Sequence, residues 1–262
     1  MKTILRKIAH GIYGFWFVAV FAACAVLALL SVLLIPTLSL RQRFVRRFTQ
    51  CIFWLTGTGP VVNGLMHLPD GPCMLVGNHA SYLDGPVMTA VLPPRFSFLI
   101  KAEMNAVPLA GFLLRRIDSF FVDRSKASKS ATSARQIIRA ARAGRALGVF
   151  PEGTFDDTPG LKQFQKGAFA VAKAGSMPIV PFVISGTRHI LPASSVWPKP
   201  GRIHVTLFAP VAVDDVLNHD VVTLRDQVRH TIIEHLDEPD LLADDDNDAQ
   251  QKNQPLKTNN AA

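Results

Sequence analysis

A histidine and an aspartate stand five positions apart in the segment Asn78-His79-Ala80-Ser81-Tyr82-Leu83-Asp84. The segment directly follows a short apolar run that predicts a buried strand. Five helical residues turn the chain through about 500°, which leaves two side chains at this spacing about 140° apart. The two side chains cannot meet within one helix, so we expect His79 in a turn before a helix that carries Asp84 about one turn in.

In this arrangement the Asp84 carboxylate can fold back onto one imidazole nitrogen of His79. The contact would fix the tautomer and stabilise the imidazolium while the other nitrogen takes a proton. Such a pair is a general base that can activate a hydroxyl group near neutral pH. The alternative is structural: a loop histidine, and a carboxylate that the helix dipole favours at a helix start.

A covalent nucleophile is less favoured than direct proton abstraction. The sequence has no Gly-x-Ser-x-Gly pattern, which marks a nucleophile elbow, and Ser81 is more economically a helix N-cap. Cys73 lies in an apolar strand candidate and Cys24 in a long apolar run, where a thiolate is disfavoured. The three cysteines form neither a disulfide framework nor a zinc pattern, and we expect no metal.

Three cations stand where predicted strands end or a predicted helix begins. Lys101 and Arg124 each follow a strand candidate, and Lys166 lies at the N-terminus of a helix candidate. Open α/β sheets bind ligands beyond the carboxyl ends of their strands, and cations there suit an anionic headgroup, above all a phosphate. Each cation taken alone is more readily explained as a solvated surface charge.

The run Phe150-Pro151-Glu152-Gly153-Thr154 also follows a predicted strand. Gly153 permits close backbone approach, and Thr154 offers a hydroxyl group or a helix cap. Glu152 could bind a substrate hydroxyl or pair with a local cation.

The elements that must position these residues alternate between strands and helices. This alternation predicts an α/β domain with a largely parallel sheet flanked by helices. Strands are expected at 72–76, 96–100, 119–122, 146–150, 178–184 and 203–208, and helices at 84–92, 108–116, 130–143, 165–174 and 221–236.

The N-terminal part of the chain predicts a membrane element. Residues 11–40 carry no charge, and the apolar stretch exceeds the roughly 20 residues with which a helix crosses a bilayer. A cleaved signal peptide has a shorter apolar part of about 7 to 15 residues, so we expect an uncleaved anchor. A single span and a helical hairpin that dips into one leaflet both fit. Residues 44–55 either lie in the interface plane or pack on the domain.

Charge and composition divide the chain into three parts. We expect a membrane anchor with an interfacial helix at 1–60, a catalytic domain at 61–236, and an acidic, solvated, disordered tail at 237–262. The net charge of +8 sits in the N-terminal part and in the middle of the chain. Because no nucleic-acid-binding module is recognisable, this charge indicates anionic lipid headgroups and excludes nucleic acid as a partner.

Four blocks in this order resemble the glycerolipid acyltransferase family, which includes the 1-acylglycerol-3-phosphate acyltransferases. The resemblance spans roughly residues 61–187, and four ordered blocks behind a membrane anchor are far more specific than a lone His-x4-Asp. The blocks are Asn78-His79 to Asp84, Phe121-Val122-Asp123-Arg124, Phe150-Pro151-Glu152-Gly153-Thr154 and Pro178-Ile179-Val180-Pro181.

The resemblance implies an acyltransferase with the fold of the glycerol-3-phosphate acyltransferases. It implies transfer of a fatty acyl group from an acyl carrier protein or coenzyme A thioester to a lysophospholipid hydroxyl, above all that of 1-acyl-sn-glycerol-3-phosphate, which gives phosphatidic acid. No metal or organic cofactor is implied. A cytosolic donor implies the inner membrane, with the catalytic domain on the cytoplasmic side.

The resemblance also implies roles for individual residues. His79 is the base, Asp84 its partner, Arg124 binds the acceptor phosphate, and Pro181 lies in the block linked to acyl binding. The remaining substrate-binding candidates are Asn78, Ser81, Lys101, Glu152, Gly153, Thr154 and Lys166.

One position departs from the family pattern. Many members follow the Gly-Thr pair with arginine, whereas this chain has Phe155 and then Asp156 and Asp157. Either Lys162 compensates for the missing cation, or the acceptor is a zwitterionic lysophospholipid or another lipid. Two other functions use the same residues: a lipid or thioester hydrolase whose His/Asp pair activates water, and a lipid-binding membrane protein with a degenerate site.

Overall fold

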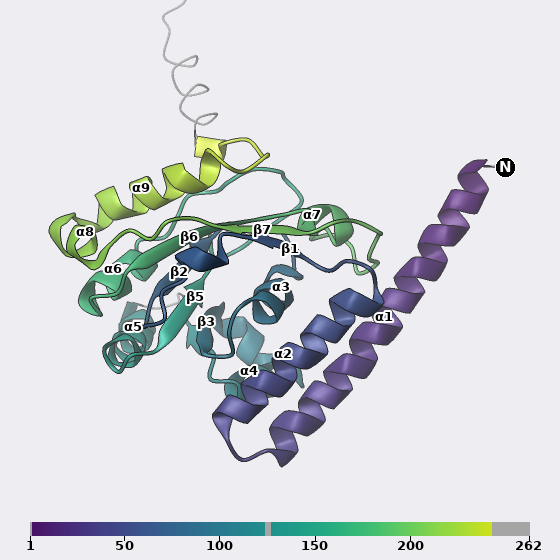
Figure 1. The fold of residues 1–262 in the computed structure, drawn as a ribbon, viewed down its shortest axis with the longest axis horizontal. Coiled ribbons are helices and arrows are strands. Elements are labelled where there is room, and N and C mark those ends of the chain that lie inside the picture. The colour runs from purple at the N-terminus through teal and green to yellow at the C-terminus, as the bar shows by residue number, and fades with distance from the viewer. Residues whose placement is uncertain (1, 124–126, 243–262) are drawn as a thin grey trace, which may run out of the picture.

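A seven-stranded sheet forms the centre of the computed structural model, which describes residues 2–123 and 127–242. All neighbouring strands are parallel except β6 and β7, which are antiparallel. The predicted α/β fold with a largely parallel sheet is therefore confirmed (Figure 1). In the spatial order of the sheet, the strands are β1 (Val61–Asn63), β7 (His204–Leu207), β6 (Ile179–Ser185), β2 (Met74–Gly77), β5 (Ala146–Val149), β3 (Phe96–Lys101) and β4 (Phe120–Val122).

Helices cover both faces of the sheet (Figure 1). One face is covered by α3 with α1 and α2 beyond it, and the other by α5, α6, α8 and α9. The α-helices in the described ranges are α1 (Lys2–Leu34), α2 (Leu38–Leu55), α3 (Asp84–Val91), α4 (Ala110–Arg116), α5 (Ala127–Arg142), α6 (Gly167–Ala174), α7 (Thr187–Ile190), α8 (Val213–Asn218) and α9 (Val221–Ile233); the short 3₁₀ helices are η1 (Leu65–His67) and η2 (Ala102–Ala106).

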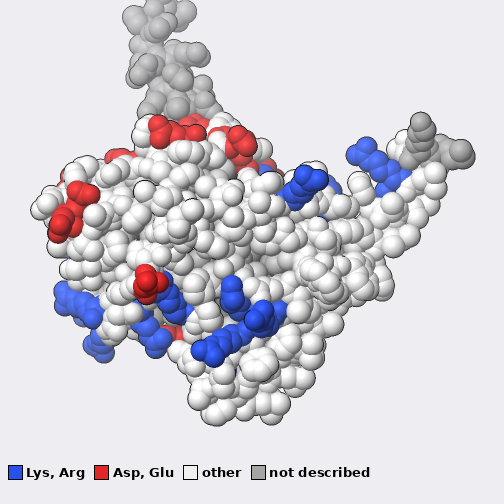
Figure 2. Space-filling model, in the orientation of Figure 1, with Lys and Arg blue, Asp and Glu red and all other residues white. Residues whose placement is uncertain are grey.

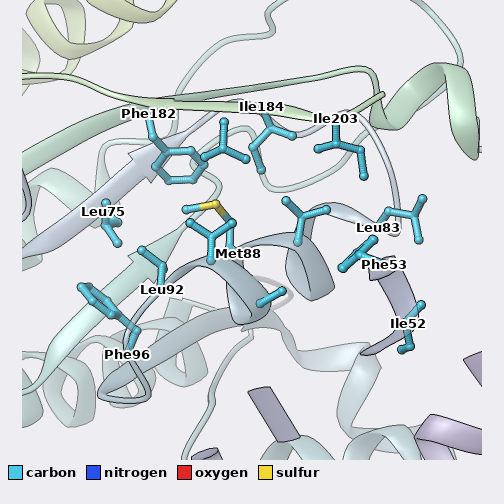
Figure 3. Close-up of a cluster of buried hydrophobic side chains, with 14 of the residues drawn as sticks. Ile52, Phe53, Leu75, Leu83, Met88, Leu92, Phe96, Phe182, Ile184 and Ile203 are labelled. Carbon is cyan, nitrogen blue, oxygen red and sulfur yellow. The ribbon is translucent and has the colours of Figure 1, made fainter. Parts of the chain in front are cut away.

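The central strands are buried on both sides, which explains their unbroken apolar sequences. Successive side chains of a strand point to opposite faces, so Leu75 joins the core under α3 while Met74 and Val76 join the core under α5, α6 and α9. Figure 3 shows the first of these cores, where Met88 of α3 lies between the sheet and the outer helices.

The N-terminal helices form an antiparallel hairpin along one side of the domain (Figure 1). The Tyr13 hydroxyl donates to the Thr56 carbonyl (3.0 Å), and the Trp16 indole donates to the Leu55 carbonyl (3.1 Å). Within the described ranges, the helical stretch Thr3–Leu34 is long and apolar enough to cross a membrane, by length and composition alone.

One face of the hairpin belongs to the core, and α1 leaves its other face exposed and apolar. Phe17 and Val20 of α1 and Phe53 of α2 are buried in the same cluster as the residues of α3. Of the two interpretations of residues 44–55, packing on the domain is the one observed. The large apolar side chains that α1 leaves exposed are Ile4, Leu5, Ile8, Ile12, Phe15, Trp16, Val18, Phe21, Val26, Leu27, Leu30, Leu33 and Leu34.

The main differences from the predicted elements are short. Helix α4 begins at Ala110 rather than at Pro108, since Leu109 has a left-handed φ of 61° and cannot belong to the helix. Strand β1 and helices α7 and α8 were not predicted, because three to six residues are too few to show a period.

The predicted tail begins too early. Residues 237–242 contact the domain, because Glu238 pairs with Arg188 and Asp240 pairs with Arg229. Composition indicates solvation for such an acidic run and cannot reveal these two distant arginines. The rest of the predicted tail, 243–262, lies outside the described residues.

Candidate active site

The candidate residues gather at the edge of the sheet where the parallel strands end. The turn 78–83 connects β2 to α3 and begins directly after Gly77. Its first residue, Asn78, is buried and fastens the turn to β6, since its side-chain amide donates to the Ile184 carbonyl (2.9 Å) and its side-chain oxygen accepts from the Ile184 N–H (2.8 Å). Asn78 therefore has a positioning role, with both polar atoms of its side chain in use.

The predicted contact between His79 and Asp84 is present. The His79 Nδ1 lies 2.8 Å from Asp84 Oδ2, and the Asp84 side chain is fully buried. The same oxygen accepts the backbone N–H groups of Ala80 (2.7 Å) and Ser81 (2.9 Å). Asp84 is the first residue of α3 rather than one turn in. It is therefore a carboxylate at a helix start that also contacts His79, and its catalytic role stays a prediction.

This geometry determines the protonation pattern of the imidazole. A carboxylate can only accept, so Nδ1 of His79 carries the proton and Nε2 of the neutral ring has the free lone pair. The side chain of His79 keeps 19% of its surface exposed while its partner has none. The pair is thus arranged as a base that is open on one side and held on the other.

Aromatic rings surround the imidazole. The Phe150 ring stacks on it with centroids 4.5 Å apart, and the Phe155 ring meets it at 61° with centroids 4.4 Å apart. Tyr82 in turn packs perpendicular to Phe155 (4.7 Å). The residue that departs from the family pattern therefore contacts the base itself, which nothing in the sequence indicated.

Glu152 braces the backbone of the histidine turn. One carboxylate oxygen accepts the His79 N–H (2.6 Å) and the other accepts the Lys162 N–H (2.9 Å). Only 6% of Glu152 is exposed, and this burial raises the pKa of its carboxyl group to about 7 despite the two hydrogen bonds. Among the described residues the partners of Glu152 are backbone N–H groups, and none is a cation in a salt bridge; its predicted substrate contact stays a prediction.

The neighbours of Glu152 place the loop that follows β5. Gly153 has a φ of 75°, a conformation that side-chain-bearing residues rarely adopt, and Thr154 is exposed. The Lys162 ammonium pairs with Asp156. The positive charge of Lys162 therefore already neutralises an acid of its own loop. This lysine was one of the two explanations offered for the missing arginine at position 155.

Two other predicted cations, Lys101 and Lys166, lie at or near the same edge. Lys101 ends β3, is largely exposed and pairs with Glu103 (3.3 Å). Lys166 directly precedes α6 and is exposed, and its neighbour Gln165 donates its N–H to the Pro151 carbonyl (2.9 Å). Arg124 lies outside the described residues.

Two of the predicted substrate-binding residues, Ser81 and Pro181, are engaged in the fold. The Ser81 hydroxyl donates to the Leu191 carbonyl (2.7 Å) and accepts the Leu83 N–H (3.1 Å). It stabilises the turn and does not cap α3, whose N-cap position is Leu83. Pro181 is buried inside β6, where it pairs in register with Val76 of β2. Across the described part of the chain, no cluster of three or more His, Cys, Asp or Glu side chains could hold a metal ion.

Comparison with known proteins identifies similar chains. A family model described as Acyltransferase matches residues 60–185. The chain is 29% identical over 197 residues to the 1-acyl-sn-glycerol-3-phosphate acyltransferase of Saccharomyces cerevisiae, covering 74% of this chain and 65% of the yeast protein. It is 30% identical over 212 residues to 1-acyl-sn-glycerol-3-phosphate acyltransferase alpha of Homo sapiens, covering 78% and 75% of the two chains.

A solved structure shares the fold. The 1-acyl-sn-glycerophosphate (LPA) acyltransferase PlsC from Thermotoga maritima superposes with a TM-score of 0.73 at 22% sequence identity, covering 87% of this chain and 94% of that one. At this identity the match establishes the arrangement of helices and strands alone.

Proposed function

Because the chain belongs to the glycerolipid acyltransferase family and is an O-acyltransferase, we propose that it transfers a fatty acyl group from an acyl thioester to the hydroxyl group of a lysophospholipid. The contact between His79 and Asp84 carries this proposal. The preferred acceptor is 1-acyl-sn-glycerol-3-phosphate, the substrate that the names of the relatives state, and the product is then phosphatidic acid. The donor is the thioester of acyl carrier protein or of coenzyme A.

The proposed reaction begins with the hydroxyl group of the acceptor at Nε2 of His79. Nε2 takes the hydroxyl proton as the oxygen attacks the thioester carbonyl, and the charge of Asp84 stabilises the imidazolium that forms. The tetrahedral intermediate then collapses, the carbon–sulfur bond breaks, and the imidazolium returns its proton to the leaving thiolate. The products are an ester and a thiol, and His79 is neutral again.

We assign the acceptor phosphate to the predicted cations. Arg124, which follows β4 in the sequence, is its main ligand, and Lys101 and Lys166 contribute longer-range attraction. We also assign Gly153 and Thr154, which follow Glu152 in the sequence, to the acceptor site. We assign Pro181 to the block linked to acyl binding. Because it lies inside β6, it would influence the shape of the site indirectly.

We propose a membrane-bound enzyme in the cell inner membrane, with its catalytic domain on the cytoplasmic side. The exposed apolar face of α1 supports membrane association. The cytoplasmic side follows from a cytosolic thioester donor, since basic residues flank the apolar stretch at both ends. Figure 2 shows basic groups at the N-terminal end of α1 and along the lower part of the molecule next to the hairpin. Basic groups beside an apolar surface favour contact with anionic lipid.

The test is acyl transfer by purified protein in detergent or vesicles. Labelled acyl thioester and a panel of lysophospholipids are supplied, and the product is identified by mass. His79→Ala should abolish transfer because it removes the base, while membrane association and thermal stability stay near those of the wild type. His230→Ala, which removes an exposed histidine of α9, is the matched control and should keep full activity.

Two results would contradict the proposal. Near-normal turnover by His79→Ala would remove the assigned base. Release of free fatty acid at the same rate with and without lysophospholipid would instead identify a hydrolase, in which the same pair activates water.

A further inference from the structure

The C-terminal segment 237–242 lies against the loop 152–164 that carries Glu152. Three hydrogen bonds from backbone N–H groups join them. The Leu161 N–H donates to the Pro239 carbonyl (2.9 Å), the Leu241 N–H donates to the Leu161 carbonyl (3.4 Å), and the Gly160 N–H donates to Glu238 Oε2 (2.9 Å). In Figure 1 the last described residues, in yellow, lie at the end of α9 beside a teal loop. The segment and the loop are about 80 residues apart in sequence, so this contact depends on the fold.

Two arginines hold the segment in place. Arg188 of α7 grips both oxygens of Glu238, with Nε at 2.9 Å and Nη2 at 3.0 Å, and also donates to the Asp156 carbonyl. Arg229 of α9 pairs with Asp240 (2.8 Å for Nη1 to Oδ2). Arg229 is only 8% exposed, and it binds both oxygens of Asp240 through Nη1 and Nη2, a bidentate geometry that adds specificity to an arginine–carboxylate pair.

The same arginine also binds the loop. Arg229 donates to the Leu161 carbonyl (2.9 Å) and to the Lys162 carbonyl (3.2 Å). Gly160 completes the fit: its φ of 137° favours glycine, and a Cβ added there would lie 2.6 Å from Leu241. Backbone, side chains and ion pairs thus clamp residues 160–162 between the segment and α9.

The clamped residues lead directly to the histidine turn. The Lys162 N–H donates to one oxygen of Glu152, and the other oxygen accepts the His79 N–H. The path from Glu238 to the base therefore consists of backbone and carboxylate hydrogen bonds through residues 160–162 and Glu152.

We propose that residues 237–242 form a strap that positions the loop 152–164, and through Glu152 the turn of His79, for binding of the acceptor. Glu238 and Asp240 are its positioning residues, since neither touches a reacting atom. The predicted effect on acceptor binding rests on the proposed acyltransferase function. The predicted effect on the position of the loop 152–164 is independent of that function.

The first test compares Glu238→Ala with Asp237→Ala. Both variants remove one acid from the same segment, but Asp237 is exposed, whereas Glu238 bonds to Gly160 and Arg188. Loss of a charge-assisted pair should raise the KM for the lysophospholipid about tenfold, with a smaller change in the KM for the thioester. Glu238→Gln keeps one acceptor oxygen and should fall between the wild type and Glu238→Ala, and Asp237→Ala should match the wild type.

A second measurement does not depend on activity. Amide hydrogen exchange in peptides from 152–164 and from 77–84 should become faster in Glu238→Ala and stay unchanged in Asp237→Ala. A chain that ends after Leu236, compared with one that ends after Leu242, should show the same acceleration in both peptides.

The outcomes separate the two proposals. If the wild type transfers no acyl group but exchange in 152–164 still accelerates, the acyltransferase proposal fails and the strap stands. If Glu238→Ala lowers the melting temperature while acceptor KM and exchange near His79 match the wild type, the segment is merely structural and the strap is overturned.

Discussion

Replacing Asp84 by asparagine should separate the charge of this residue from its hydrogen bonds. One oxygen of Asp84 accepts three bonds, from His79 Nδ1 and from the N–H groups of Ala80 and Ser81. The amide oxygen of asparagine can take the same place, so Asp84→Asn should preserve the turn and the imidazole tautomer. It removes the negative charge that faces the imidazolium and places the amide nitrogen at the buried Oδ1 position, where no described group is a hydrogen-bond partner.

The size of the loss follows from Coulomb's law. Two unit charges about 4 Å apart interact by about 4 kcal/mol at an effective dielectric constant of about 20. This energy is gained only when the imidazolium forms, so it lowers the barrier to proton transfer. At about 1.4 kcal/mol per factor of ten, Asp84→Asn should slow the chemical step about a thousandfold, as measured by single-turnover acyl transfer at saturating acceptor.

Replacing Asp84 by alanine should affect the stability of the fold more than replacing it by asparagine. Alanine leaves the buried N–H groups of Ala80 and Ser81 without an acceptor, at a cost of about 1–3 kcal/mol for each group. The melting temperature should therefore fall more in Asp84→Ala than in Asp84→Asn. Transfer by Asp84→Asn within tenfold of the wild type would refute the reasoning, because the charge would then contribute little to the imidazolium.

Two further predictions concern stability. The folded state holds the Glu152 proton more tightly than the unfolded chain does, with a pKa of about 7 against an ordinary 4.5. As the pH rises from 4.5 to 7, unfolding free energy from urea titrations should therefore fall by up to about 3 kcal/mol in the wild type relative to Glu152→Gln; parallel pH curves would exclude this linkage. Gly77→Ala should destabilise the fold by about 1–3 kcal/mol, because its Cβ would lie 2.2 Å from the Phe182 ring, while Gly71→Ala, which meets nothing within 4 Å, should be neutral in thermal melts; equal melting temperatures would contradict this packing argument.

The sequence is sufficient to predict features that depend on neighbouring residues. The contact between His79 and Asp84 spans five positions, and the geometry of a strand, a turn and a helix start leaves few other arrangements. The central strands are equally predictable, since burial on both faces requires an unbroken apolar run.

Features that depend on distant residues are not predictable in this way. Glu152 reads as a substrate ligand because its backbone partners, His79 and Lys162, are fixed only by the packing of the loop. Glu238 reads as part of a tail because Arg188 lies 50 positions earlier. Composition records the charge of a residue but does not identify its partner, and the partner decides whether an acidic residue is solvated or docked.

The shared core of the hairpin and the domain affects how this enzyme can be handled. Phe17, Val20 and Phe53 fill the same cluster as the residues of α3, so cutting the chain before the first strand would strip one wall from the catalytic half. A chain shortened in this way should aggregate, because the side of α3 that the hairpin covers is apolar. The helix that we propose attaches the protein to lipid is therefore also part of the folded core.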